Sequence, residues 1–350
     1  MKKKRVSPLW AGIDSLSLDK RNFDPSRGDI EGICRFFAIG MLQHFEKEKN
    51  ISVSHSNFFV FAATTQGAYA LKFYPRNASK IITREYALNR ILTHHHFPTP
   101  IMNAGLDGQP FVLSNDLLVT CYSYIKGIPV WHDIKHIKTI HQINAALLLL
   151  KNILSTSKER IPLQKQERLT TTINGLVQES RSLAPYTHKK IIDASLKDSC
   201  RIYQRHQPLF TRQCLHNNAG LTNFLIDQKT VYTLDLSHIK EDYILSDLAS
   251  LVISCLFRSI PVKTIKTIVK DYFTQHNIGS EGLIVLHALL KIKIISEYLR
   301  NIKYEKNLKL SVPSPGLAHT YMPHLLAYKK IAAPLLKGMN NISGLIGTDG

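Results

Sequence analysis

The spacing of hydrophobic residues changes along the chain and predicts two structural regions. Residues 29–49 carry apolar side chains near helical spacing behind acidic Asp29 and Glu31, so they predict an amphipathic helix. Short runs rich in aromatic and β-branched residues follow, separated by turn residues, and these runs predict antiparallel strands. The strands are expected at residues 51–57, 58–64, 68–74, 111–114 and 117–121, with a helix at residues 81–93 between the third and the fourth.

From residue 137 onward the pattern is mainly helical. Helices are expected at residues 137–154, 169–182, 188–204, 247–258, 262–275 and 282–301. Residues 223–237 interrupt them with alternating apolar positions around a polar turn, which predicts a hairpin. The Gly- and Asn-rich tail after Gly338 is expected to fray. This order predicts an α+β fold, divided into an N-terminal extension with its helix (1–50), a small lobe (51–124) and a helical lobe (125–350).

Composition narrows the class of protein. With 350 residues the chain can bury a full core, and five cysteines without C-x-x-C spacing predict reduced thiols and a cytoplasmic location. The longest apolar run spans only residues 145–150, which predicts no membrane span. A net charge of +19 favours anionic partners such as nucleotides. Because this charge is spread along the chain without a base-reading motif, nucleic acid is the weaker of the anionic partners.

The candidate chemistry lies at the predicted hairpin. Asn223 directly precedes its first strand and Asp235 ends its second. A hairpin returns the chain to the end where it started, so this amide and this carboxylate are expected at the same end. Oxygen ligands of this kind suit a hard divalent cation that also binds phosphate oxygens. The alternative is that both residues only cap the hairpin in a surface loop.

His216, Asn218, Asn223 and Asp235 together resemble the signature of the aminoglycoside/choline kinase and homoserine-kinase-like phosphotransferases, which reads H-x-D-x-x-x-x-N, then a hairpin, then D. The family's downstream D-L-A is similar to Asp247-Leu248-Ala249. The resemblance implies a two-lobed protein-kinase-like fold, with an antiparallel-sheet N-lobe and a mainly helical C-lobe, that uses ATP and Mg²⁺. It also implies that Asn223 and Asp235 hold the metal, that Asn218 occupies the catalytic position, and that His216 braces the loop.

The small lobe adds further candidate residues. Lys72 lies in mid-strand among apolar residues, and Glu85 lies in the next helix, where a strand-to-helix crossover would pair the two. A strand lysine that faces solvent is the ordinary alternative. The resemblance implies that Lys72 contacts nucleotide phosphates while Glu85 holds it. It also implies that Tyr122, Ser123 and Tyr124 form a hinge whose backbone binds the adenine edge.

The sequence departs from the family pattern at three places. Asn218 replaces the aspartate that accepts the proton of the acceptor hydroxyl, Ser237 stands where an acidic residue is common, and residues 54–57 lack glycines. General-base help is worth about 10²–10⁴ in rate. Phosphoryl transfer depends chiefly on positioning and charge stabilisation, so losing the base impairs catalysis without forbidding it. Asp242 and His238 are the nearest substitutes for the base in the sequence.

Two functional hypotheses lead, ahead of a third in which polyanion binding is the main task and the fold is its carrier. The first is an ATP- and Mg²⁺-dependent phosphotransferase that acts on a hydroxyl of a small acceptor, with activity reduced by Asn218. Lys and Arg outnumber Asp and Glu in residues 169–205 and 262–301, where the family builds its acceptor site, so a neutral or anionic acceptor is expected. The second hypothesis is a catalytically impaired pseudokinase that acts as a nucleotide-binding module or binds a protein partner.

Overall fold

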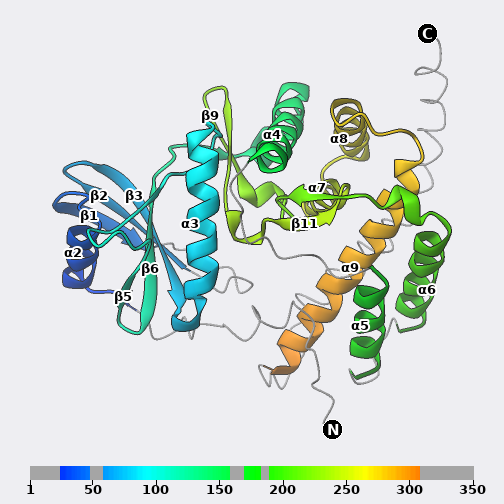
Figure 1. Cartoon of the computed structure of the whole chain (residues 1–350), viewed down its shortest axis with the longest axis horizontal. Coiled ribbons are helices and arrows are strands. Elements are labelled where there is room, and N and C mark those ends of the chain that lie inside the picture. Colours follow the sequence, from blue (N-terminus) through cyan, green and yellow to red (C-terminus); the bar gives the residue numbers. More distant parts are fainter. Residues whose placement is uncertain (1–23, 48–57, 158–168, 183–188, 308–350) are drawn as a thin grey trace. The chain divides into compact units, whose positions relative to one another are not determined.

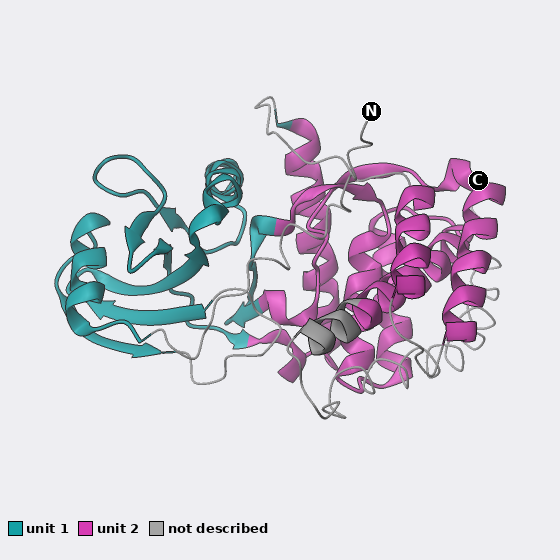
Figure 2. Ribbon diagram, turned by 90° about the horizontal axis from the view of Figure 1, so that it is seen from below, with its two compact units in different colours: residues 1–128, 157–162, 225–237 teal, residues 129–156, 163–224, 238–350 magenta. Residues whose placement is uncertain are grey.

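The computed structural model describes residues 24–47, 58–157, 169–182 and 189–307. The strand expected at residues 51–57, the glycine-free segment 54–57 and the tail after Gly338 therefore lie outside the described residues. The chain divides into two compact units (Figure 2): the first comprises residues 1–128, 157–162 and 225–237, and the second comprises residues 129–156, 163–224 and 238–350. The division of the sequence at residues 50 and 124 stays a prediction.

The first unit is built on a six-stranded antiparallel sheet with one helix on each face (Figure 1). Its strands pair in the order β1-β2-β3-β6-β4, with β5 also on β6. They are β1 (Leu42–Lys47), β2 (Phe58–Thr64), β3 (Gly67–Pro75), β4 (Met102–Asn103), β5 (Val112–Ser114) and β6 (Leu117–Ser123). On one face α2 (Arg27–Phe36) closes an apolar core that includes the stacked rings of Phe58 and Phe73, whose centroids are 4.5 Å apart. On the other face α3 (Ser79–His94) buries Ile82 against Tyr74 and Tyr122.

The helix predicted over residues 29–49 is wrong in its second half. Helix α2 begins behind a capping box, in which Ser26 and Asp29 each bond the backbone N–H of the other. It ends at Phe36, and Gly40 then takes a left-handed φ of 91° that turns the chain into β1. A Cβ at Gly40 would lie 2.5 Å from Thr65 Oγ1, so this turn requires glycine. The apolar residues after the turn serve a strand that pairs with β2 rather than a helix.

The hairpin predicted at residues 223–237 is confirmed. Strands β9 (Phe224–Asp227) and β10 (Thr230–Thr233) form a small sheet with β7 (Ile128–Pro129). Thr233 N–H donates to the Pro98 carbonyl at 2.9 Å, and Thr99 Oγ1 donates to the Thr233 carbonyl at 2.9 Å. These bonds tie the end of the hairpin to the segment that follows α3.

The second unit contains the six helices that the sequence predicts. They are α4 (Ile137–Thr156), α5 (Leu169–Ser182), α6 (Lys189–Arg205), α7 (Ser246–Phe257), α8 (Val262–Gln275) and α9 (Gly282–Asn307). Helix α7 is mostly buried, α9 packs against α5, α6 and α7, and α4 packs against α8. Short 3₁₀ turns in the two units span Arg76–Ala78, Val130–His132, Gln207–Leu209, Leu221–Asn223 and Leu236–His238.

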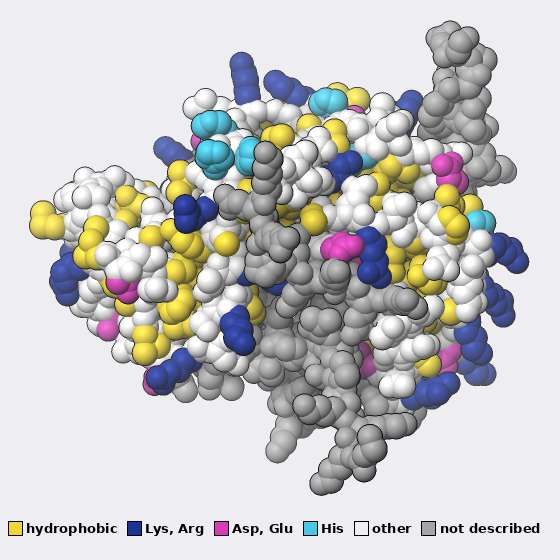
Figure 3. Space-filling view, in the orientation of Figure 1, with side chains coloured by type: hydrophobic (Ala, Val, Ile, Leu, Met, Phe, Trp, Pro, Cys, Tyr) yellow, Lys and Arg dark blue, Asp and Glu magenta, His cyan; other side chains and the backbone are white. Residues whose placement is uncertain are grey.

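One ribbon of the second unit has no counterpart among the sequence predictions. Strands β8 (Arg212–Leu215) and β11 (Lys240–Tyr243) pair antiparallel. Each has four residues and mostly polar side chains, so neither shows the apolar alternation by which a strand is predicted. None of the helices in the described part of the chain combines the length and the hydrophobicity that a membrane span needs. Lys and Arg side chains are spread over the face shown in Figure 3 rather than gathered into one patch.

We expect His276, directly after α8, to make the fold sensitive to mild acid. Its side chain is buried and stacks on the Tyr272 ring, with 3.8 Å between the two ring centroids. Neither of its ring nitrogens has a hydrogen-bond partner among the described residues. Burial lowers the pKa of His276 from 6.5 to about 4. Because the folded value is the lower one, the stability that this residue confers is present above pH 6.5 and is lost as the pH falls toward 4. The loss is about 2–3 kcal/mol.

Urea denaturation at pH 7 and pH 4.5 checks this expectation. The variant His276→Phe keeps a ring on Tyr272 but cannot take up a proton, so its free energy of unfolding should fall less between the two pH values than that of the wild type. Equal losses in the two proteins would contradict the assignment.

Candidate active site

Lys72 and Asp235 form an ion pair in the first unit. Lys72 lies in the middle of β3 and is 5% exposed, and its Nζ is 3.1 Å from Asp235 Oδ1. Asp235 follows β10 with a left-handed φ of 55°, and its side chain is 29% exposed. Burial opposes the charge of Lys72, but the nearby carboxylates of Asp235 and Glu85 outweigh burial and raise its pKa above the ordinary value. The lysine is therefore cationic at neutral pH.

Helix α3 holds the loop that carries Asp235. Arg84 Nη2 donates to the Ser237 carbonyl at 2.6 Å, and Ser237 Oγ donates to Asp235 Oδ1 at 2.8 Å. Ser237 thus binds the carboxylate through its hydroxyl. Arg84 is not among the predicted site residues, because an arginine beside a glutamate on a helix gives no sign of a backbone partner about 150 residues away.

The predicted ion pair between Lys72 and Glu85 is not formed. Glu85 is 2% exposed, and its Oε2 accepts a hydrogen bond from Tyr74 Oη at 2.9 Å. Tyr74 lies two residues after Lys72 on β3, so its side chain is on the same face of the strand. Its hydroxyl, rather than the Lys72 ammonium group, is the donor to Glu85. Tyr122 is also buried there, with its hydroxyl 3.4 Å from that of Tyr74. Glu85 still acts on Lys72 through its charge.

The predicted hinge continues from β6 with two backbone donors already engaged. Ser123 N–H donates to the Ile101 carbonyl at 2.8 Å, and Tyr124 N–H donates to the Ala68 carbonyl at 3.0 Å. Tyr122, the first of the three predicted hinge residues, is in the strand and pairs with Met102 and Ala70 on its two sides. These residues are therefore fixed by the sheet.

In the second unit, Asp247 of α7 holds the loop after β8 through hydrogen bonds. Asp247 is 1% exposed and accepts the backbone N–H groups of His216 at 3.0 Å and Asn217 at 2.6 Å. The buried ring of His216 accepts the N–H of Asn218 through Nδ1 at 3.3 Å. Asn223 Nδ2 donates to the Asn218 carbonyl at 2.6 Å. Asn218 is half-buried, and its side-chain amide forms no hydrogen bond with another described residue.

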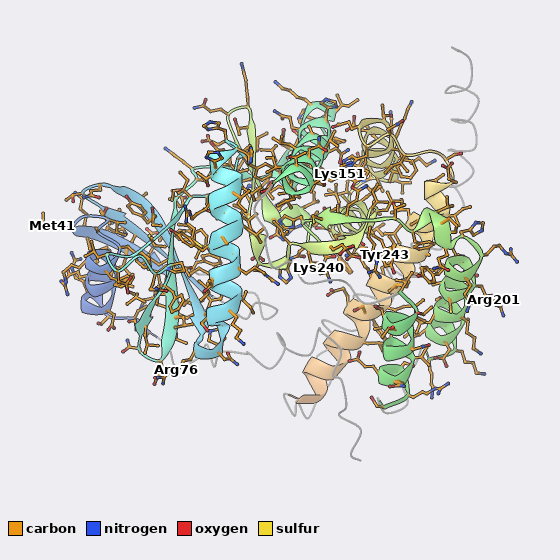
Figure 4. All side chains as sticks on the ribbon, viewed as in Figure 1. Met41, Arg76, Lys151, Arg201, Lys240 and Tyr243 are labelled. Atoms are coloured by element: carbon orange, nitrogen blue, oxygen red, sulfur yellow. The ribbon has the colours of Figure 1, made fainter. Side chains whose placement is uncertain are left out.

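Strand β11 supports the same loop from a second direction. When the Asn217 amide is oriented to satisfy its neighbours, its nitrogen donates to Asp242 and its oxygen accepts from Lys240 Nζ at 3.0 Å. Asp242 is 4% exposed and also accepts the N–H of Tyr243 at 2.7 Å. Lys240 and Tyr243 lie at the two ends of the strand (Figure 4). These contacts give Asp242, a candidate base in the sequence, a structural role beside Asn217.

We expect Asp247→Ala to destabilise the protein by about 2 kcal/mol, because it leaves two buried N–H groups without an acceptor. Burial raises the pKa of Asp247, and the two backbone N–H groups that it accepts oppose this rise. The midpoint of urea denaturation measures the loss. The exposed carboxylate Glu46 on β1 provides the control Glu46→Ala, which should leave the midpoint unchanged. An Asp247→Ala midpoint equal to the wild-type value would show that the loop does not depend on this brace.

Residues 48–280, well over half of the chain, match the model of a family described as the phosphotransferase enzyme family. The chain belongs to the phosphotransferase enzyme family. No curated protein sequence matches it.

Solved structures agree with this family. An aminoglycoside phosphotransferase from Alicyclobacillus acidocaldarius is 12% identical, with a TM-score of 0.66, over 93% of this chain and 99% of that chain. Amicoumacin kinase hAmiN, solved with AMP-PNP, Ca²⁺ and Ami, is 13% identical, with a TM-score of 0.64, over 93% and 96%. Choline kinase from Cryptosporidium parvum is 13% identical, with a TM-score of 0.61, over 90% and 99%. At these identities the likeness establishes the fold, and it confirms the kinase-like α+β fold predicted from the sequence.

Proposed function

We propose that this phosphotransferase transfers a phosphoryl group from ATP, with Mg²⁺, to a hydroxyl of a small neutral or anionic acceptor. The Lys72–Asp235 ion pair is the observation that supports it most. It brings a buried cation on a central strand to a carboxylate from a distant hairpin, at 3.1 Å. Many buried ion pairs have only a structural role. This one joins the two residues that the family motif assigns to phosphate and to metal.

On the nucleotide side, Lys72 supplies a point charge for the phosphates and the hinge supplies backbone groups for the base. The N–H groups of Ser123 and Tyr124 are engaged in the sheet, so Ile125, next along the chain, is the first hinge residue whose N–H has no acceptor among the described residues. We propose Ile125 N–H as the donor to the adenine edge, with the predicted Tyr122, Ser123 and Tyr124 lying beside the base rather than supplying its N–H donor.

On the metal side, the chain offers oxygen atoms, which are the ligands that Mg²⁺ prefers. Asp235 offers a carboxylate, and its loop is fixed to α3 through Ser237. Asn223 uses its amide nitrogen on the Asn218 carbonyl, which leaves the amide oxygen as its ligand atom. Each of these two residues thus offers an oxygen atom of the kind that a hard cation prefers. When bound, Mg²⁺ would neutralise charge on the phosphates.

On the acceptor side, Asn218 would orient the hydroxyl without taking its proton. Its backbone is fixed by His216 and Asn223, and its amide has no other described partner. The excess of Lys and Arg in residues 169–205 and 262–301 supports an acceptor that is not a polycation.

A pseudokinase is the second candidate, and Asn218 is the observation that favours it. A protein with this amide would retain nucleotide and metal binding through Lys72, Asn223 and Asp235, yet lack the group that activates the acceptor. Binding is common to the two candidates, whereas turnover belongs to the first.

Calorimetric titration with AMP-PNP, with and without Mg²⁺, combined with ATP turnover against a panel of small hydroxyl compounds, tests the proposal. Binding that strengthens with Mg²⁺, together with acceptor-dependent turnover, is the expected result. Lys72→Met keeps the apolar stem and removes the charge, so it should weaken nucleotide binding. Binding without turnover would select the pseudokinase, and absence of binding would end both proposals.

A further inference from the structure

We propose that Tyr74 is a positioning residue that occupies Glu85, keeps Lys72 on Asp235, and thereby sets the Mg²⁺ concentration at which the site takes up metal. The inference rests on the proposed function, because it assigns a control of metal binding to the same site. It adds a residue that the family motif does not include.

The geometry places Tyr74 between the lysine and the helix. Lys72 and Tyr74 are separated by one residue on β3, so both face α3. Lys72 Nζ lies 4.8 Å from the centre of the Tyr74 ring, and Tyr74 Oη lies 2.9 Å from Glu85 Oε2. The tyrosine therefore contacts the cation with its face and the carboxylate with its hydroxyl.

The charges of two carboxylates, Asp235 and Glu85, act on Lys72, although it is Asp235 that forms an ion pair with it. Glu85 is 2% exposed, and the Tyr74 side chain contacts both Glu85 and Lys72, so the carboxylate and the ammonium group belong to one buried cluster. The charge of Glu85 accordingly raises the pKa of Lys72. A buried carboxylate needs a donor, and the Tyr74 hydroxyl is the hydrogen-bond donor to Glu85 among the described residues. Because that donor is neutral and in place, Lys72 can pair with Asp235 instead. The Tyr122 hydroxyl lies 3.4 Å from that of Tyr74, within hydrogen-bond distance.

The arrangement has a consequence for metal uptake. With Lys72 on Asp235, a cation that binds this carboxylate must displace an ammonium group. If Glu85 lost its donor, it would draw Lys72 toward α3, and Asp235 would meet a metal with less competition. Tyr74 thus raises the metal concentration that the site requires and couples the release of Lys72 to metal entry.

The test is the Mg²⁺ concentration at half-saturation, measured by calorimetric binding of AMP-PNP over a series of Mg²⁺ concentrations. Tyr74→Phe removes one hydroxyl and keeps the ring, and it should lower this midpoint by about 3- to 10-fold, the effect of one hydrogen bond. The double variant Tyr74→Phe/Glu85→Gln should return to the wild-type midpoint, because a neutral amide no longer competes for the lysine.

Tyr86→Phe is the matched control. Tyr86 packs in the same cluster on α3, but its hydroxyl makes no hydrogen bond with a described residue, so its midpoint should equal that of the wild type. A Tyr74→Phe midpoint that does not move, or one that stays low in the double variant, would overturn the inference while leaving the proposed function intact. Wild-type protein that binds no Mg²⁺–nucleotide would overturn both.

Discussion

Replacing Asp235 by asparagine is expected to lower phosphoryl-transfer turnover by about 10³-fold or more. The reason is that Asp235 is the one carboxylate of the proposed metal ligands, and charge stabilisation by a bound metal is worth several kcal/mol of barrier. Asn223, the other proposed ligand, is neutral, so the variant would have to hold a divalent cation with two amide oxygens.

The stability of Asp235→Asn should change little, in contrast to its activity. Removing one partner of a buried ion pair usually costs several kcal/mol, because it leaves a charge without compensation. Here Glu85 also acts on the Lys72 charge, so the lysine keeps an acidic neighbour. Steady-state turnover and thermal denaturation on the same preparations separate the two effects. Asp227→Asn, a carboxylate at the turn of the same hairpin, is the control and should keep wild-type turnover. Wild-type turnover in Asp235→Asn would remove this residue from the metal site.

Asn218→Asp should raise turnover by about 10²-fold or more. An aspartate at this position can accept the proton of the acceptor hydroxyl, and general-base help is typically worth about 10²–10⁴. The substitution is nearly isosteric, and the amide that it replaces holds no other described residue, so the fold should tolerate it. The main-chain bonds of Asn218 to His216 and Asn223 remain available to position the new carboxylate.

The neighbouring variant Asn217→Asp is the matched control for Asn218→Asp. It adds the same charge one residue away, but beside the buried carboxylate of Asp242, where a second negative charge is unfavourable. It should lower stability and give no gain in turnover. If Asn218→Asp also gives no gain, Asn218 does not stand where the acceptor hydroxyl binds, and the role proposed for it is wrong.

The sequence predicted most elements because their apolar spacing is set by a single packed face. Helices α5 and α8 begin and end at their predicted residues, since each presents one regular apolar stripe to its neighbours. The prediction failed where a local turn outweighed the pattern, as at Gly40, and where a strand is short and polar, as in β8 and β11. Neither feature leaves a periodic signal.

The candidate site was predictable only in part. The motif placed Lys72 and Asp235 in one site, and they are in contact. Their immediate partners were not predictable, because Tyr74, Arg84 and Ser237 act through hydrogen bonds that depend on how strand, helix and loop approach one another. The predicted Lys72–Glu85 pair was wrong for the same reason. The sequence pattern predicts Tyr74 only as a core residue. Its hydroxyl binds Glu85, and Lys72 pairs with Asp235.

The hairpin that carries Asp235 belongs to the first unit, although residues 129–156 and 163–224 of the second unit precede it in the chain. The Pro98 and Thr99 bonds to Thr233, together with the Arg84 bond to Ser237, hold it there. A chimera that borrows only residues up to about 128 from this protein would therefore inherit a buried lysine from one parent and its acidic partner from the other. Exchanging residues 225–237 along with the sheet would take Lys72 and Asp235 from the same parent protein.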